Sequence, residues 1–152
     1  MSEHQKEVRL ATAALQAALA GKWERASRYL VRISEECGGD GLYLALIAWA
    51  DTFIAHATDG DLTGKVGGIS FIQTTTGQLD QPGSEYVPAE VQWAGRLIRA
   101  RAALDETAWQ AILDELPDDG YRRGAYVQAA LQCVALTING LPRGYARMGR
   151  PS

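Results

Sequence analysis

The segment from residue 42 to residue 57 constrains the fold most, because it is apolar on nearly every side of a helix. Asp51 is the single charged residue in its body. A helix without a polar face is normally buried by its neighbours on all sides. We therefore expect this segment to form the central helix of an all-α protein, with further helices packed around it.

Apolar residues recur at helical spacing in five further segments. These segments are residues 2–20, 23–37, 88–104, 107–116 and 121–139. We expect Gly21 and the run Gly38-Gly39-Asp40-Gly41 to separate the first three helices, and a capping box of Thr107 and Gln110 to open the fifth. The sequence thus predicts about six helices.

The predicted helices fall into two three-helix units, residues 1–57 and 88–140, which we expect to pack as antiparallel hairpins in a single domain. Ala17-Ala-Leu19 of the first unit recurs as Ala102-Ala-Leu104 in the second, each shortly before a tryptophan. An internal duplication explains this likeness, and so does chance among alanine-rich helices. Residues 141–152 form a basic tail that we expect to be flexible.

Residues 58–87, which join the two units, show no helical period and hold six of the chain's 16 glycines. Residues 69–72 and 74–76 favour β-structure, and Gly77 suits a turn, so a short β-hairpin is the structure that this insert favours. Loops longer than about 12–15 residues are uncommon in compact domains and often have a function. We therefore treat the insert as a candidate contact region.

Composition narrows the classes of function. A hydrophobic content of 47% with 22% charged residues is ordinary for a globular protein, and the net charge of −3 argues against a dedicated nucleic-acid binder. No apolar run approaches the ~20 residues that span a bilayer. Two cysteines and the lack of a leader-like start predict a cytoplasmic protein without a disulfide framework. Abundant alanine, and arginine in place of lysine, are typical of a GC-rich bacterial or phage genome.

Gly21, Trp23 and Ala26 resemble the start of the second helix of a tetratricopeptide hairpin. That family has a small residue in the turn, an aromatic residue two positions on and a packing alanine three positions beyond it. The resemblance covers residues 17–33, and the family's period of about 34 residues does not recur. It implies an antiparallel helical hairpin at this point of the chain.

Asp51 is the first candidate site residue. A carboxylate on an apolar helix needs a charged or hydrogen-bonding partner, and we expect an arginine of the second unit to supply it. The alternative is a ligand cleft between this helix and the insert. The candidate residues for that cleft are Asp51, Trp49, His56, Phe71 and Thr75. The simpler roles are a core anchor for Trp49 and a helix-end position for His56.

Asp59, Asp61 and Thr63, followed by Gly64, look like the front of an EF-hand calcium loop. Such a loop takes a bidentate carboxylate at its twelfth position, where this chain has Ser70. Half of the ligand set is therefore missing, and a turn rich in Asp and Gly is the simpler interpretation. The two histidines and two cysteines also lack zinc-ligand spacing. We expect no bound metal and no cofactor.

No catalytic motif is complete, because the chain has neither a Gly-x-Ser-x-Gly elbow nor a cysteine with a recognisable partner. Our leading hypothesis is a non-enzymatic helical interaction module or adaptor that binds a protein partner. A small-molecule-binding or enzymatic helical bundle, with its site near Asp51 and the insert, is the alternative. A nucleic-acid accessory factor is a weaker one, and homo-oligomerisation stays open. The basic residues that could bind nucleic acid are Arg96, Arg99, Arg101, Arg122, Arg123 and the arginines of the tail.

Overall fold

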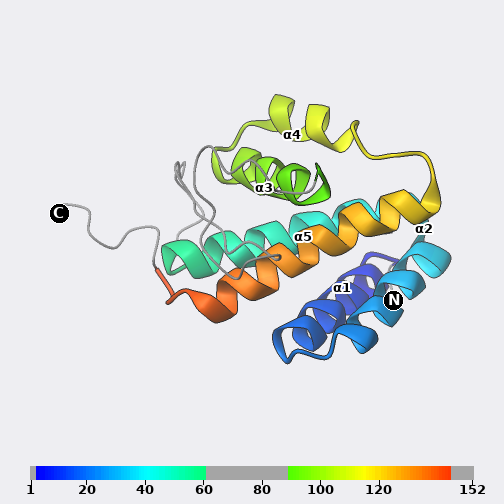
Figure 1. Ribbon diagram of the computed structural model, residues 1–152, viewed down its shortest axis with the longest axis horizontal. Coiled ribbons are helices and arrows are strands. Elements are labelled where there is room, and N and C mark those ends of the chain that lie inside the picture. Colours follow the sequence, from blue (N-terminus) through cyan, green and yellow to red (C-terminus); the bar gives the residue numbers. More distant parts are fainter. Residues whose placement is uncertain (1–2, 61–88, 145–152) are drawn as a thin grey trace.

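Five α-helices make up the part of the protein that the structure describes (Figure 1). The computed structural model describes residues 3–60 and 89–144. The helices are α1 (Glu3–Leu19), α2 (Trp23–Thr58), α3 (Ala89–Ala102), α4 (Glu106–Leu113) and α5 (Gly120–Gly140). Residues 3–60 and 89–144 contain no strand, so the all-α prediction is confirmed for them. The β-hairpin predicted for the insert lies outside the described residues.

Helix α2 contains both the second and the third predicted helix, joined at a kink. Gly38 has φ 70° and ψ −162°, whereas the residues on both sides of it are helical. Essentially only glycine occupies this region of backbone space. We predicted that residues 38–41 would separate two helices; instead a single residue bends the chain, which gives five elements in place of six.

The second half of α2 and helix α5 lie side by side at the centre of the molecule (Figure 1). The hairpin of α1 and the first half of α2 covers one side of this pair, and α3 with α4 covers the other. Trp49 and Phe53 of α2 and Leu131 of α5 are fully buried. The predicted central position of residues 42–57 is therefore confirmed, although Tyr43 and Thr52, on different sides of this helix, are exposed.

The turns after α1 and α3 share one backbone geometry. Each contains a left-handed residue, Gly21 with φ 76° and Leu104 with φ 57°. In each, the N–H of this residue donates to the carbonyl three residues back, and the next N–H donates to the carbonyl five residues back. Both turns are thus Schellman motifs. This likeness agrees with an internal duplication, which stays a prediction.

Helix α4 begins earlier than predicted. Its N-cap is Asp105, whose carboxylate accepts a hydrogen bond from the Ala108 N–H at 3.0 Å. The predicted capping box of Thr107 and Gln110 is therefore wrong. Aspartate is at least as good an N-cap as threonine, and here it lies two residues upstream, directly after the turn that ends α3.

None of the helices in residues 3–60 and 89–144 combines the length and the apolar character that a bilayer span requires.

The kink gives a first testable prediction. Gly38→Ala should lower the free energy of unfolding by about 1–3 kcal/mol, because alanine is strained in this backbone region. Gly39→Ala is the matched control: Gly39 is helical, and a Cβ there meets no atom within 4 Å. This control should be neutral or stabilising by about 0.5–1 kcal/mol. Urea unfolding followed by circular dichroism measures both, and equal effects would show that Gly38 does not hold the kink.

Candidate functional site

The charge in the central helix is paired across the two predicted units. Arg101 of α3 donates from Nε and Nη2 to the two carboxylate oxygens of Asp51, at 2.9 and 3.1 Å. The Arg101 and Asp51 side chains are 34% and 37% exposed. The predicted arginine partner is therefore present, but Asp51 lies at the edge of the core rather than inside it.

The Arg101 side chain connects three helices. Its guanidinium lies over the ring of Trp109 in α4, 5.8 Å from the ring centroid, while it binds Asp51 of α2. The hydrogen bond to Asp51 raises the pKa of Arg101 above its usual value, and partial burial opposes this rise. A hollow of about 80 Å³ adjoins Arg101, well below the ~300–1,000 Å³ of typical small-molecule sites. This arrangement supports a structural role for Asp51.

Trp49 is a core anchor. Its side chain is buried, and its indole Nε1 donates to the carbonyl oxygen of Ala11 at 2.9 Å, which ties α1 to α2. Trp93 makes the same kind of contact between α3 and α4, where its Nε1 donates to the carbonyl oxygen of Ile112 at 2.7 Å. Because buried indole N–H groups need such acceptors, both contacts fix how two helices pack.

His56 lies in the last turn of α2, where it contacts the segment that follows α5. Its Nε2 is 2.8 Å from the carbonyl oxygen of Leu141, and its own carbonyl accepts from the Gly144 N–H at 2.6 Å. Arg143 adds a bond from Nε to the Asp59 carboxylate at 2.7 Å. Residues 141–144, the start of the predicted flexible tail, are therefore held against α2, and residues 145–152 lie outside the described part.

Of the three proposed calcium ligands, Asp59 alone belongs to the residues that the structure describes. The Asp59 carboxylate binds a guanidinium, while Asp61 and Thr63 lie outside the described residues. No group of three or more His, Cys, Asp or Glu side chains in residues 3–60 and 89–144 is arranged to hold a metal ion. Phe71 and Thr75 also lie outside these residues, so a cleft between α2 and the insert stays a prediction.

Several arginines of the suggested basic patch bind groups of the protein itself. Arg96 makes two hydrogen bonds of 2.8 Å to the carboxylate of Glu115, which link α3 to the end of α4. These bonds raise the pKa of Arg96 and lower that of Glu115. Arg101 binds Asp51 as described, and Arg123 donates to the carbonyl oxygen of Pro117 at 3.1 Å. These contacts favour structural roles over phosphate binding.

A groove of about 470 Å³ opens between the first half of α2 and the first two turns of α5. One face of each helix lines it, because the lining residues follow one another at helical spacing. The residues from α2 include Ser27, Leu30, Val31, Ser34 and Glu35. Those from α5 include Gly120, Tyr121, Arg123, Gly124, Val127 and Gln128.

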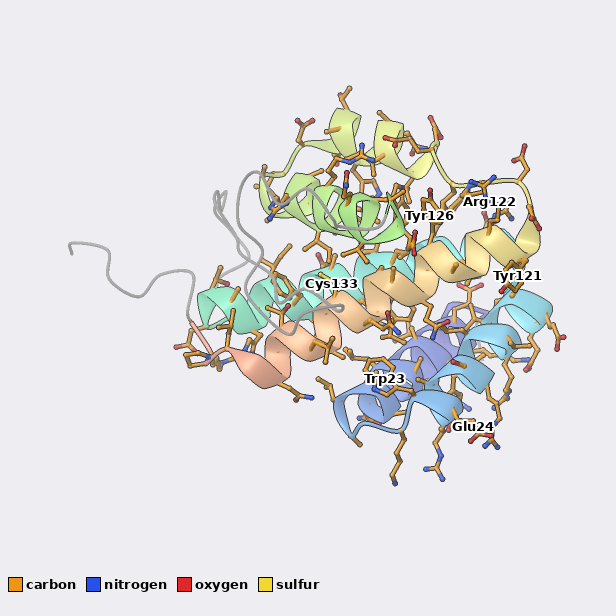
Figure 2. The ribbon with its side chains drawn as sticks, viewed as in Figure 1. Trp23, Glu24, Tyr121, Arg122, Tyr126 and Cys133 are labelled. Atoms are coloured by element: carbon orange, nitrogen blue, oxygen red, sulfur yellow. The ribbon has the colours of Figure 1, made fainter. Side chains whose placement is uncertain are left out.

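The groove has an apolar floor and two exposed apolar side chains at its edges. Leu42 and Val127 form buried parts of the floor. Val31 on the α2 wall is 54% exposed, and Tyr121 on the α5 wall is 88% exposed. Figure 2 shows Tyr121 at the first turn of α5, close to the end of the first half of α2. Glu35 and Arg123 add one charge to each wall, so a polar margin borders an apolar interior.

Two glycines leave the α5 wall without side chains. A Cβ at Gly120 or Gly124 would meet no atom within 4 Å, and neither residue has a positive φ. Within the described part of the chain, neither backbone conformation nor close packing therefore requires glycine here. Glycine costs about 1 kcal/mol relative to alanine inside a helix. Both glycines leave the groove open, and Gly124, which lies inside α5, does so at some expense in helix stability.

The groove was missed in the sequence. The available signal was the pair Gly120 and Gly124 at a spacing of four, with Tyr121 between them, at the start of a predicted helix. Periodicity alone does not place this face opposite residues 27–35 of α2.

No family model, no curated protein and no solved structure matches this chain. The hairpin of α1 and the first half of α2 has the antiparallel form that the tetratricopeptide resemblance implied (Figure 1). The likeness is therefore one of local geometry.

The role of Asp51 can be measured. Asp51→Asn should lower the free energy of unfolding by about 1 kcal/mol, a modest loss because the pair is partly exposed. Arg101→Met should have a similar effect, and a double-mutant cycle should give a coupling of about 0.5–1 kcal/mol. The matched control is the cycle of Arg96→Met and Glu115→Gln, a more exposed pair that should couple more weakly. Fully additive effects at Asp51 and Arg101 would contradict a structural pair.

Proposed function

We propose that this chain is a non-enzymatic helical interaction module whose groove between α2 and α5 binds an apolar-faced helix of another polypeptide. The observation that carries the proposal is the groove of about 470 Å³ with Val31 and Tyr121 exposed on its opposite edges. Single exposed apolar residues are common on protein surfaces. Two of them at the margins of one groove, over an apolar floor, have the arrangement of a binding site.

The shape of the groove supports a helical occupant. Both of its walls are helices, and each presents small residues: Ser27 and Ser34 on α2, and Gly120 and Gly124 on α5. Small residues let the backbone of an incoming helix approach closely. An amphipathic helix that lays its apolar face into a groove is a recurrent mode of protein recognition. The expected occupant thus presents apolar side chains at the spacing of one helical face.

A small-molecule site in the same groove is the second candidate, because the volume falls within the ~300–1,000 Å³ of such sites. A small ligand is usually oriented by a few buried polar groups. In residues 3–60 and 89–144, every buried side-chain nitrogen and oxygen already has a hydrogen-bond partner. This favours an apolar helix over a polar metabolite.

We also propose a cytoplasmic location. The support is that neither Cys37 nor Cys133 is in a disulfide, as is usual for proteins of a reducing compartment.

Site-specific photo-crosslinking in cells of the source organism tests the groove. A photoreactive phenylalanine analogue at position 31 should crosslink to a partner polypeptide. The same analogue at Tyr43, an exposed apolar residue that does not line the groove, should not. Gly124→Leu should fill the groove without unfolding α5, because a Cβ there meets open space. It should remove the crosslink from position 31.

Equal crosslinking from positions 31 and 43 would contradict the proposal, and so would a crosslink that survives Gly124→Leu in a folded protein. Circular dichroism of the Gly124→Leu variant supplies the control for folding.

A further inference from the structure

We propose that the polypeptide in the groove is a second copy of this chain, which makes the protein a two-fold symmetric dimer through α2 and α5. The inference rests on the proposed function, since it names the partner of the same groove. It places the two-fold axis along the groove. The α2 wall of each copy then faces the α5 wall of the other copy.

The exposed apolar side chains fit this arrangement. Val31 lies on the α2 wall and Tyr121 on the α5 wall. A rotation about an axis along the groove exchanges the two walls, so Tyr121 of each copy lies against the α2 wall of the other, and Val31 lies against the α5 wall. A two-fold interface repeats every contact, so one rotation covers both of the exposed side chains in both copies. No unrelated partner is needed to explain why the groove carries both.

The open positions on α5 supply the space. Above Gly120 and Gly124 the groove has room that no atom of the described chain fills. The Tyr121 ring, which is 88% exposed, stands on the same wall as this space. Exchange of the walls sets the α2 wall of the other copy, which carries Val31, against this space, so each copy offers room for apolar side chains of the other. Aromatic side chains buried at the centre of an interface commonly contribute most of its affinity.

The charged residues of the groove also fit a two-fold arrangement. Glu35 lies on the α2 wall and Arg123 on the α5 wall, both lining the groove. Exchange of the walls sets Glu35 of each copy opposite Arg123 of the other, which places unlike charges together twice. Arg123 is partly held by the carbonyl oxygen of Pro117, and its Nη2 lies 3.9 Å from the Asp118 carboxylate. Its remaining N–H groups can donate to the partner's carboxylate.

The alternative axis, perpendicular to the groove, is disfavoured by the same residues. It would set each α2 wall against the α2 wall of the other copy, and each α5 wall against α5. The wall with Glu35 would then face the other wall with Glu35, and the wall with Arg123 the other wall with Arg123, so no pair of unlike charges would form between the copies. Like charges that face each other across an interface oppose association.

Sedimentation velocity of the full chain tests the dimer. The wild type should sediment as a dimer whose proportion falls on dilution. Tyr121→Ser should raise the dissociation constant about tenfold or more, because it removes the aromatic contact twice. Tyr43→Ser, at an exposed aromatic residue outside the groove, should leave the constant unchanged. Circular dichroism confirms that each variant is folded.

A charge exchange tests the arrangement of the two walls. Glu35→Arg alone and Arg123→Glu alone should each sediment as monomers, because each places like charges opposite one another. An equimolar mixture of the two variants should restore dimers, because each contact then joins an arginine of one copy to a glutamate of the other. The mixture can restore dimers only if position 35 of one copy faces position 123 of the other copy.

Dimers that are unaffected by these variants, or a mixture that stays monomeric, would overturn the inference. A wild type that remains monomeric at about 0.5 mM would also overturn it, since even a weak dimer is populated at that concentration. If such a monomer still crosslinks from position 31 to a different protein, the second copy is refuted and the interaction module stands. If position 31 crosslinks to nothing, both proposals fail.

Discussion

The packing of the apolar half of α2 against α5 determines where the other helices lie. Trp49 and Phe53 on one helix and Leu131 and Val134 on the other are buried almost completely. Burial of a large apolar side chain contributes roughly 1.5–3 kcal/mol, so this contact is a large part of the core. Helices α1 and α3 each contact both members of the pair, and α4 reaches the core through α3. The outer helices thus take their positions from two segments about 80 residues apart in the chain.

The charged pairs act on this frame in a different way. Asp51 with Arg101, Glu115 with Arg96 and Asp59 with Arg143 each join segments that are distant in the sequence. All of them are at least a third exposed, so each adds little to the net stability. Their geometry is nonetheless specific, because a two-pronged arginine–carboxylate pair such as Asp51 with Arg101 accepts few orientations. The apolar core supplies most of the stability, and these pairs select one arrangement of α3, α4 and residues 141–144.

The sequence predicted the features that depend on local pattern or on one strong requirement. The central helix followed from its apolar periodicity, and the arginine partner of Asp51 followed from the need of a partly buried carboxylate. Two local predictions differed: a single glycine bends α2 where a break was expected, and Asp105 caps α4 in place of Thr107. The groove was beyond prediction because it depends on how α2 and α5 lie in space. The sequence alone does not show that Gly124 lines a groove, because this depends on the empty space above it.

The kink in α2 also sets the width of the groove. Val31 stands before Gly38 and Leu42 after it, so one wall and the floor of the groove lie on opposite sides of a hinge. The stretch from Gly38 back to Ser27 acts as a lever arm of about 16 Å, at about 1.5 Å per residue. A bend that differed by about 10° would place the far end of the arm about 3 Å away, which is about the thickness of the side-chain layer around a helix. The dihedral angles of Gly38 therefore set the width of the groove, and the burial of Ala26 and Ile33 in the core holds the arm in place.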